Sequence, residues 1–73
     1  MEYKKYGIVN RKNRLCAVYS KPSVLSRVLV KLIPGDLVEI DSDNSTECYY
    51  KVLTETNDVG YIMQNNIDTE GGD

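Results

Sequence analysis

The chain has 73 residues, enough for one small domain, with a net charge of −2 and no histidine. Histidine is the usual general acid or base at neutral pH and a common zinc ligand, so its absence argues against an enzyme and against a zinc site. The slightly acidic balance also argues against a dedicated nucleic-acid binder. We therefore expect a non-catalytic domain that holds no metal and needs no cofactor.

The N-terminal residues 1–5 are rich in charge, and we expect them to form a frayed end. No apolar run in the sequence is long enough for a signal peptide or a membrane-spanning helix. As written, the sequence predicts a cytoplasmic protein without membrane insertion, or an extracellular one if it is a module of a longer secreted protein. Cys16 and Cys48 are expected to be free thiols in the first case, and one disulfide is the alternative in the second.

Short runs rich in β-branched and aromatic residues alternate with polar turns along the chain, which predicts an all-β fold. A chain of this length suits a small SH3-like barrel of five or six short antiparallel strands around one core. We also expect one helical turn near residues 64–67 that places Ile67 on the core. The expected strands cover residues 6–10, 15–19, 28–33, 37–40, 48–54 and 59–63.

The best-defined element is segment 28–40, in which two apolar runs flank a short turn. Pro34 presets φ for the second turn position, and Gly35 supplies the positive φ that a type II turn needs at the third. We therefore expect the two runs to pair as a hairpin at the centre of the sheet. In the second run, alternation places Val38 on the core face and Leu37 outside.

A second hairpin is expected from strands 48–54 and 59–63, joined by the polar turn 55–58. Successive residues of a strand point to opposite faces, so the neighbours Tyr49 and Tyr50 must diverge. We expect Tyr50 on the core side and Tyr49 outside. Two longer loops, at residues 20–26 and 41–47, complete the expected barrel.

Four segments occur in an order that is typical of one family of small β-barrels. They are CAVYSKPS at 16–23, the strands of 28–40 around Gly35, CYYKV at 48–52 and NDVGYI at 57–62. In this order the chain resembles the bacterial SH3-like domains (SH3b, SH3 type 3) over residues 6–67, with 68–73 as a disordered tail. The resemblance implies a β-barrel with a binding role, often toward cell-wall peptide, and no catalysis. Lys21 and Cys48 stand where the family has glycine, and Tyr49 replaces its usual tryptophan.

All six aromatic residues are tyrosines. Tyrosine combines a large apolar ring with a hydroxyl at the wet edge, which suits both binding surfaces and the walls of a small barrel. Alternation turns Tyr19, Tyr49 and Tyr61 outward, and we expect them to line a groove beside the two longer loops. The expected ligand is an extended peptide or a protein partner, with Leu37 as an additional contact. The alternative is that the rings only cap a core too small to hide them.

For a module of a larger secreted protein, the resemblance implies peptidoglycan peptide as the ligand. A third hypothesis follows from charge, because eight of the nine Lys and Arg residues lie at or before Lys31 and ten of the eleven acidic residues follow it. Folding either interleaves the two halves or leaves one basic face. Such a face would offer Arg11, Lys12 and Arg14 as contacts for an anion such as nucleic-acid phosphate. The simpler alternative is a solvated basic loop.

Overall fold

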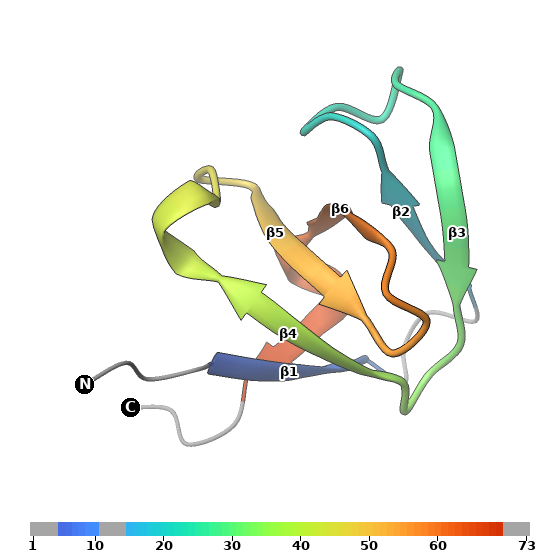
Figure 1. Cartoon of the computed structure of the whole chain (residues 1–73), viewed down its shortest axis with the longest axis vertical. Coiled ribbons are helices and arrows are strands. Elements are labelled where there is room, and N and C mark those ends of the chain that lie inside the picture. Colours follow the sequence, from blue (N-terminus) through green and yellow to red (C-terminus); the bar gives the residue numbers. More distant parts are fainter. Residues whose placement is uncertain (1–4, 11–14, 70–73) are drawn as a thin grey trace.

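The computed structural model describes residues 5–10 and 15–69 of the chain. Within them the chain forms seven strands and two short 3-10 helices (Figure 1). The strands are β1 (Lys5–Val9), β2 (Cys16–Tyr19), β3 (Val28–Leu32), β4 (Leu37–Asp41), β5 (Tyr49–Thr54), β6 (Val59–Met63) and β7 (Ile67–Thr69), and the helices are η1 (Ser42–Asn44) and η2 (Gln64–Asn66). The all-β class and the helical turn near residues 64–67 are confirmed, and the strand count is one higher than expected.

All seven strands belong to one antiparallel sheet, in the order β3-β2-β6-β5-β4-β1-β7. Every strand contributes at least one side chain to a single buried cluster, so the sheet curls around one core. The buried hydrophobic residues are Val9, Cys16, Val18, Leu32, Val38, Ile40, Val52, Ile62 and Ile67. The expected alternation is confirmed, since Tyr50 packs against this core while Tyr49 lies on the opposite face of β5.

Segment 28–40 does not form the hairpin that its sequence predicts. Its turn is as expected, since the carbonyl of Ile33 accepts a hydrogen bond from the amide of Asp36 at 3.1 Å and Gly35 has a φ of +96°. The strands on either side separate, because β3 pairs with β2 while β4 pairs with β1 and β5. A type II turn does not match the natural twist of two paired strands, which explains why the hairpin prediction is wrong.

The turn is instead attached to β1. Gly35 donates its amide hydrogen to the carbonyl of Val9 at 3.0 Å, and the amide of Val9 donates to the carbonyl of Asp36 at 2.9 Å. The Asp36 carboxylate also accepts a hydrogen bond from the amide of Ile33 at 3.0 Å. Segment 28–40 is therefore the corner at which the chain passes from the β2–β3 side of the sheet to the β4–β1 side (Figure 1).

The second hairpin, β5–β6, forms as expected, with residues 55–58 as its turn. Asn57 takes a left-handed φ of 68°, which asparagine tolerates better than most residues. The side-chain oxygen of Thr54, a buried polar residue, accepts a hydrogen bond from the amide of Asp58 at 3.0 Å. These contacts fix the register that brings the outward residues of β5 and β6 side by side.

Two boundaries differ from the sequence expectation. Lys5, expected in a frayed end, begins β1 opposite Ile40, and Asp68, expected in a disordered tail, lies in β7 opposite Ile8. Strand pairing uses backbone groups, so polar residues can join a sheet without apolar side chains to signal it. Thr69, also expected in that tail, ends β7, and residues 1–4 and 70–73 lie outside the described residues. Ile67 is buried in the core, as expected.

Candidate functional site

The three outward tyrosines lie together on the outer face of the sheet. Tyr19 on β2 and Tyr61 on β6 are direct cross-strand partners. The rings of Tyr19 and Tyr49 meet edge to face, with centroids 6.4 Å apart and an interplanar angle of 82°. All three residues are half-buried, so each ring is supported by neighbours and still offers a surface to a ligand. We call Tyr19, Tyr49 and Tyr61 the tyrosine group.

Strand register extends the tyrosine group into a row across four strands. Asp41 on β4 faces Lys51 on β5, and Lys51 faces Tyr61. Tyr61 in turn faces Tyr19. Neighbouring strands are about 4.8 Å apart, so the row is roughly 15 Å long. An acid, an amine and two phenol rings therefore follow one another on a single face.

Two of the residues beside the tyrosine group were not anticipated from the sequence. Lys51 faces Tyr61, and Met63 faces Tyr49, across the β5–β6 ladder. Both are half-buried. Alternation along β5 and β6 was a sufficient signal for them, because each lies two residues from an outward tyrosine.

The loop that leads into Tyr49 is held in place by hydrogen bonds. The amide of Thr46 donates to the carbonyl of Tyr49 at 2.8 Å, and the Thr46 side-chain oxygen accepts from the amide of Tyr49 at 3.0 Å. The side chain of Gln64 donates to the carbonyl of Thr46 at 2.8 Å. This loop is therefore tied both to its own strand and to η2.

The loop that follows Tyr19 has its own hydrogen bonds. The amide of Ser20 donates to the carbonyl of Arg27 at 2.8 Å and closes the base of the loop. The hydroxyl of Ser26 donates to the carbonyl of Ser23 at 2.7 Å and lies 3.0 Å from the carbonyl of Lys21. Both loops beside the tyrosine group are thus ordered by local contacts before any ligand binds.

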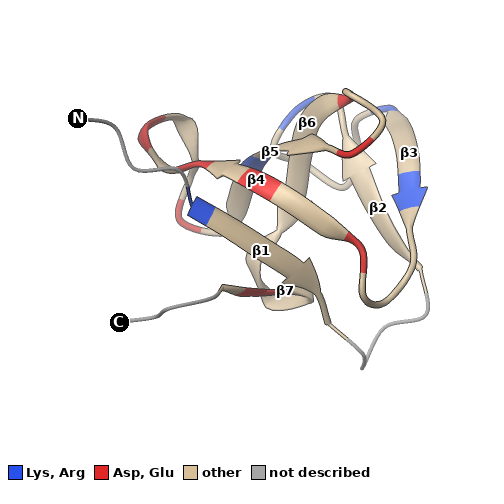
Figure 2. Cartoon of the chain, turned by 60° about the horizontal axis from the view of Figure 1, so that its bottom comes forward, with Lys and Arg blue, Asp and Glu red and all other residues tan. Residues whose placement is uncertain are grey.

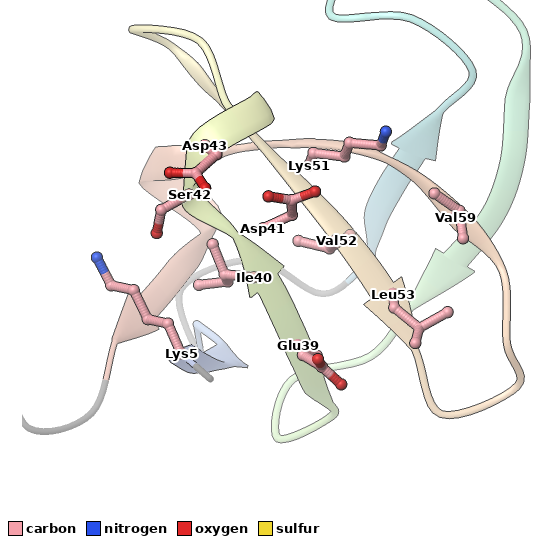
Figure 3. A pocket seen from close by; sticks show the side chains of 10 residues that line it. All are labelled: Lys5, Glu39, Ile40, Asp41, Ser42, Asp43, Lys51, Val52, Leu53 and Val59. Atoms are coloured by element: carbon pink, nitrogen blue, oxygen red, sulfur yellow. The ribbon is translucent and has the colours of Figure 1, made fainter. Parts of the chain in front are cut away.

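A hollow of about 640 Å³ lies on the outer face of β4 and β5, next to the tyrosine group (Figure 3). Its lining includes three acidic residues, Glu39, Asp41 and Asp43, and Figure 3 shows the amines of Lys5 and Lys51 on opposite sides of Asp41. We call it the acidic hollow. None of the three tyrosines lines it, whereas Asp41 and Lys51 belong both to the hollow and to the row. The concave surface therefore lies beside the rings rather than between them.

Leu37 lies apart from the tyrosine group. It faces Ile8 across the β1–β4 ladder, and the two side chains are 39% and 40% exposed. Along β4 it is four residues from Asp41, a distance of roughly 13 Å at the spacing of a strand. The structure therefore brings three of the four expected peptide contacts together and places Leu37 in a separate apolar pair with Ile8.

The expected anion contacts, Arg11, Lys12 and Arg14, lie outside the described residues. In the described part, basic residues of the β2–β3 hairpin stand apart from the acidic residues of β4 and its neighbouring turns (Figure 2). Lys5 and Lys51 interrupt the acidic region. The described surface is thus mixed around β4 and β5 and basic along β3.

The two thiols are free and differ in environment. Cys16 lies in the core, where burial raises the pKa of its thiol, whereas Cys48 is exposed. Among residues 5–10 and 15–69, no group of three or more His, Cys, Asp or Glu side chains is arranged to hold a metal ion. No helix in this part of the chain has the length and apolar character needed to cross a membrane.

The chain matches no family model and no curated protein sequence. The class of protein is therefore defined by the fold and the surface alone. It is a small antiparallel β domain whose outer face carries a preformed aromatic group beside an acidic hollow.

Proposed function

We propose that this domain is a non-catalytic binding module that recognises an extended peptide segment of a partner protein through the tyrosine group. The convergence of Tyr19, Tyr49 and Tyr61 from three strands onto one face is the observation that carries the proposal. Aromatic rings with a wet hydroxyl edge are enriched at binding hot spots because they bury a large area at a small cost in conformational entropy. The two hydrogen-bonded loops beside them reduce the entropy lost on binding.

The neighbouring charges favour a particular kind of peptide. Apolar or proline residues of the ligand pack on the rings of the tyrosine group. A cationic side chain next to them reaches the carboxylates of Asp41 and Asp43 in the acidic hollow. Lys51 lies between the two subsites and pairs with ligand backbone carbonyls or carboxylates. The preferred ligand is thus an extended segment that combines apolar and basic residues.

The absence of histidine, noted above, supports a binding role over catalysis. The pKa of Cys16 is raised by its burial, which keeps this thiol protonated and unreactive at neutral pH. Cys48 is exposed and lies in the loop just before Tyr49, where its amide donates to the side-chain oxygen of Thr46. The Cys16 thiol therefore lacks the lowered pKa that activates a cysteine nucleophile.

The test is a peptide-array screen followed by titration of the best peptide into the wild type and two variants. Removing two rings in the double variant Tyr49→Ala, Tyr61→Ala should weaken binding by about tenfold or more. Ile8→Ala is the control, because Ile8 is 40% exposed on β1 and faces Leu37, away from both the tyrosine group and the acidic hollow. Equal affinity in the double variant and the wild type, with both folded by circular dichroism, would refute the role of the tyrosine group.

A second candidate ligand is the peptide of peptidoglycan, and the motif order shared with SH3b domains is the observation that favours it. This version predicts that the domain sediments with purified peptidoglycan and that the double tyrosine variant stays in the supernatant. Sedimentation of both proteins to the same extent would count against it. Recovery of wild-type protein in the supernatant leaves the intracellular peptide as the ligand.

A further inference from the structure

Strand β3 lies at one end of the sheet and is paired on one side only. Its partner is β2, and no other described strand runs along its outer edge (Figure 1). The backbone N–H and C=O groups of alternate β3 residues therefore point away from the sheet. A row of such unpaired groups is a template for another strand. The other edge strand, β7, has three residues, against five in β3.

The same hairpin carries most of the exposed apolar side chains. Six of the ten large hydrophobic residues that are exposed in the described part lie between residues 15 and 33. They are Leu15, Val24, Leu25, Val28, Leu29 and Ile33. Leu25 is 93% exposed and Ile33 is 56% exposed. Exposed apolar side chains that cluster on one element mark an interaction surface rather than a solvated one.

The charge of this hairpin specifies what can pair with it. Residues 15–33 contain three cations, Lys21, Arg27 and Lys31, and no acidic residue. Figure 2 shows blue and no red on β3. A β-bulge shifts the register of β3, so that Val28 faces Tyr19 and Lys31 faces Ala17 of β2. Lys31 therefore lies between Val28 and Ile33 on the solvent side, and all three are exposed. The edge therefore presents an apolar, a basic and an apolar side chain in succession.

We propose that β3 accepts an extended segment of a partner protein as an additional strand, and that this segment carries an acidic residue between two apolar residues on its solvent side. Backbone hydrogen bonds supply the pairing, and cross-strand contacts with Val28, Lys31 and Ile33 select the sequence. A second copy of β3 fits less well, because pairing two such strands brings like charges together. The outer edge of β3 lies on the other side of β2 from Tyr61 on β6 and Tyr49 on β5, although Val28 faces Tyr19 across the β2–β3 ladder.

The probe is a short synthetic peptide with threonine at every second position and valine, glutamate and valine, in that order, at the positions between. The control peptide has lysine in place of glutamate. An opposite-charge cross-strand pair is worth roughly 0.2–1 kcal/mol. Wild-type protein should therefore prefer the glutamate peptide, and Lys31→Glu should weaken its binding about two- to fivefold and strengthen binding of the lysine peptide. Lys21→Glu, the same charge change in the loop of this hairpin but outside β3 and the acidic hollow, should alter the two affinities less than Lys31→Glu does.

Amide hydrogen exchange locates the bound peptide. The glutamate peptide should protect amides of β3, and the Tyr49→Ala, Tyr61→Ala variant should bind it with wild-type affinity. Affinities unchanged by Lys31→Glu would overturn the proposal, as would protection confined to other strands. Protection of β3 that rises with protein concentration in the absence of peptide would instead assign the edge to a second copy. Binding to phosphatidylserine vesicles without binding to the peptide would assign the hairpin to a membrane surface, which also overturns the proposal.

Discussion

The close approach of Gly60 to Tyr19 and Val18 matters both for the packing of β6 against β2 and for the arrangement of the tyrosine group. Gly60 lies in β6, next to Tyr61, and faces residues of β2. A Cβ atom at this position would lie 2.6 Å from the carbonyl oxygen of Tyr19 and 2.6 Å from Cγ1 of Val18. Both distances are far below van der Waals contact, and the carbonyl belongs to the backbone of a strand. Gly60→Ala must therefore push β2 and β6 apart.

Two opposing terms set the size of the effect. Overpacking of a core by one methyl group costs roughly 1–3 kcal/mol. Replacing glycine by alanine recovers about 0.4–1 kcal/mol, because it restricts the unfolded chain. We expect a net loss of about 1–2 kcal/mol in the free energy of unfolding, which lowers Tm by roughly 4–16 °C for a domain of this size.

Urea and thermal denaturation followed by circular dichroism measure this loss, and Gly35→Ala is the control. No atom lies within 4 Å of a Cβ added at Gly35, but its φ of +96° makes any side chain there strained. That variant should also lose about 1 kcal/mol, through backbone strain alone. Nuclear Overhauser contacts between the rings of Tyr19 and Tyr49 separate the two causes, because only Gly60→Ala should weaken them. A Gly60→Ala protein within about 0.5 kcal/mol of wild type, with these contacts intact, would refute the reasoning.

The other predictions concern the core and the thiols. Ile62→Ala, at a fully buried site, should cost about 2–5 kcal/mol in urea denaturation, whereas Val59→Ala on the same strand, 53% exposed, should stay within about 0.5 kcal/mol; similar losses would contradict the assigned core. Burial raises the pKa of the Cys16 thiol above its ordinary 9.0, so the native state disfavours its thiolate and stability should fall as pH rises past about 9. A thiol reagent at pH 8 should therefore label Cys48 rapidly and Cys16 only on unfolding, and equal labelling rates in the folded protein would contradict this.

The sequence predicts on which face of a strand a side chain lies, but it does not predict which strands pair with one another. Inward and outward faces follow from the period of two, so Val38 and Tyr50 were placed correctly from the sequence. Which strands pair depends on long-range contacts that no local pattern contains. The strand β7 is the clearest case, because Asp68 has the composition of a tail and joins the sheet through its backbone opposite Ile8.

The same distinction applies to the candidate site. The tyrosine group was predictable, because each ring occupies an outward position in a strand that the sequence marks well. The acidic hollow was not, since Glu39 and Asp41 come from β4 while Lys51 comes from β5, and their approach requires the β4–β5 register. Leu37 satisfied the same alternation rule as the tyrosines, but it lies at the opposite end of β4 from the row. Orientation can be inferred locally, whereas proximity across a sheet cannot.

The turn at Pro34 and Gly35 links these results to the proposed partner strand. A type I′ or II′ turn at this place would have folded β3 back onto β4 and placed both strands inside the sheet. The positive φ of Gly35 at the third turn position, together with the hydrogen bonds from the turn to Val9, sends β4 toward β1 instead. Strand β3 is left with β2 as its only described partner, and its outer edge stays open. The local turn chemistry thus determines both how the sheet curls and which strand remains available for another chain.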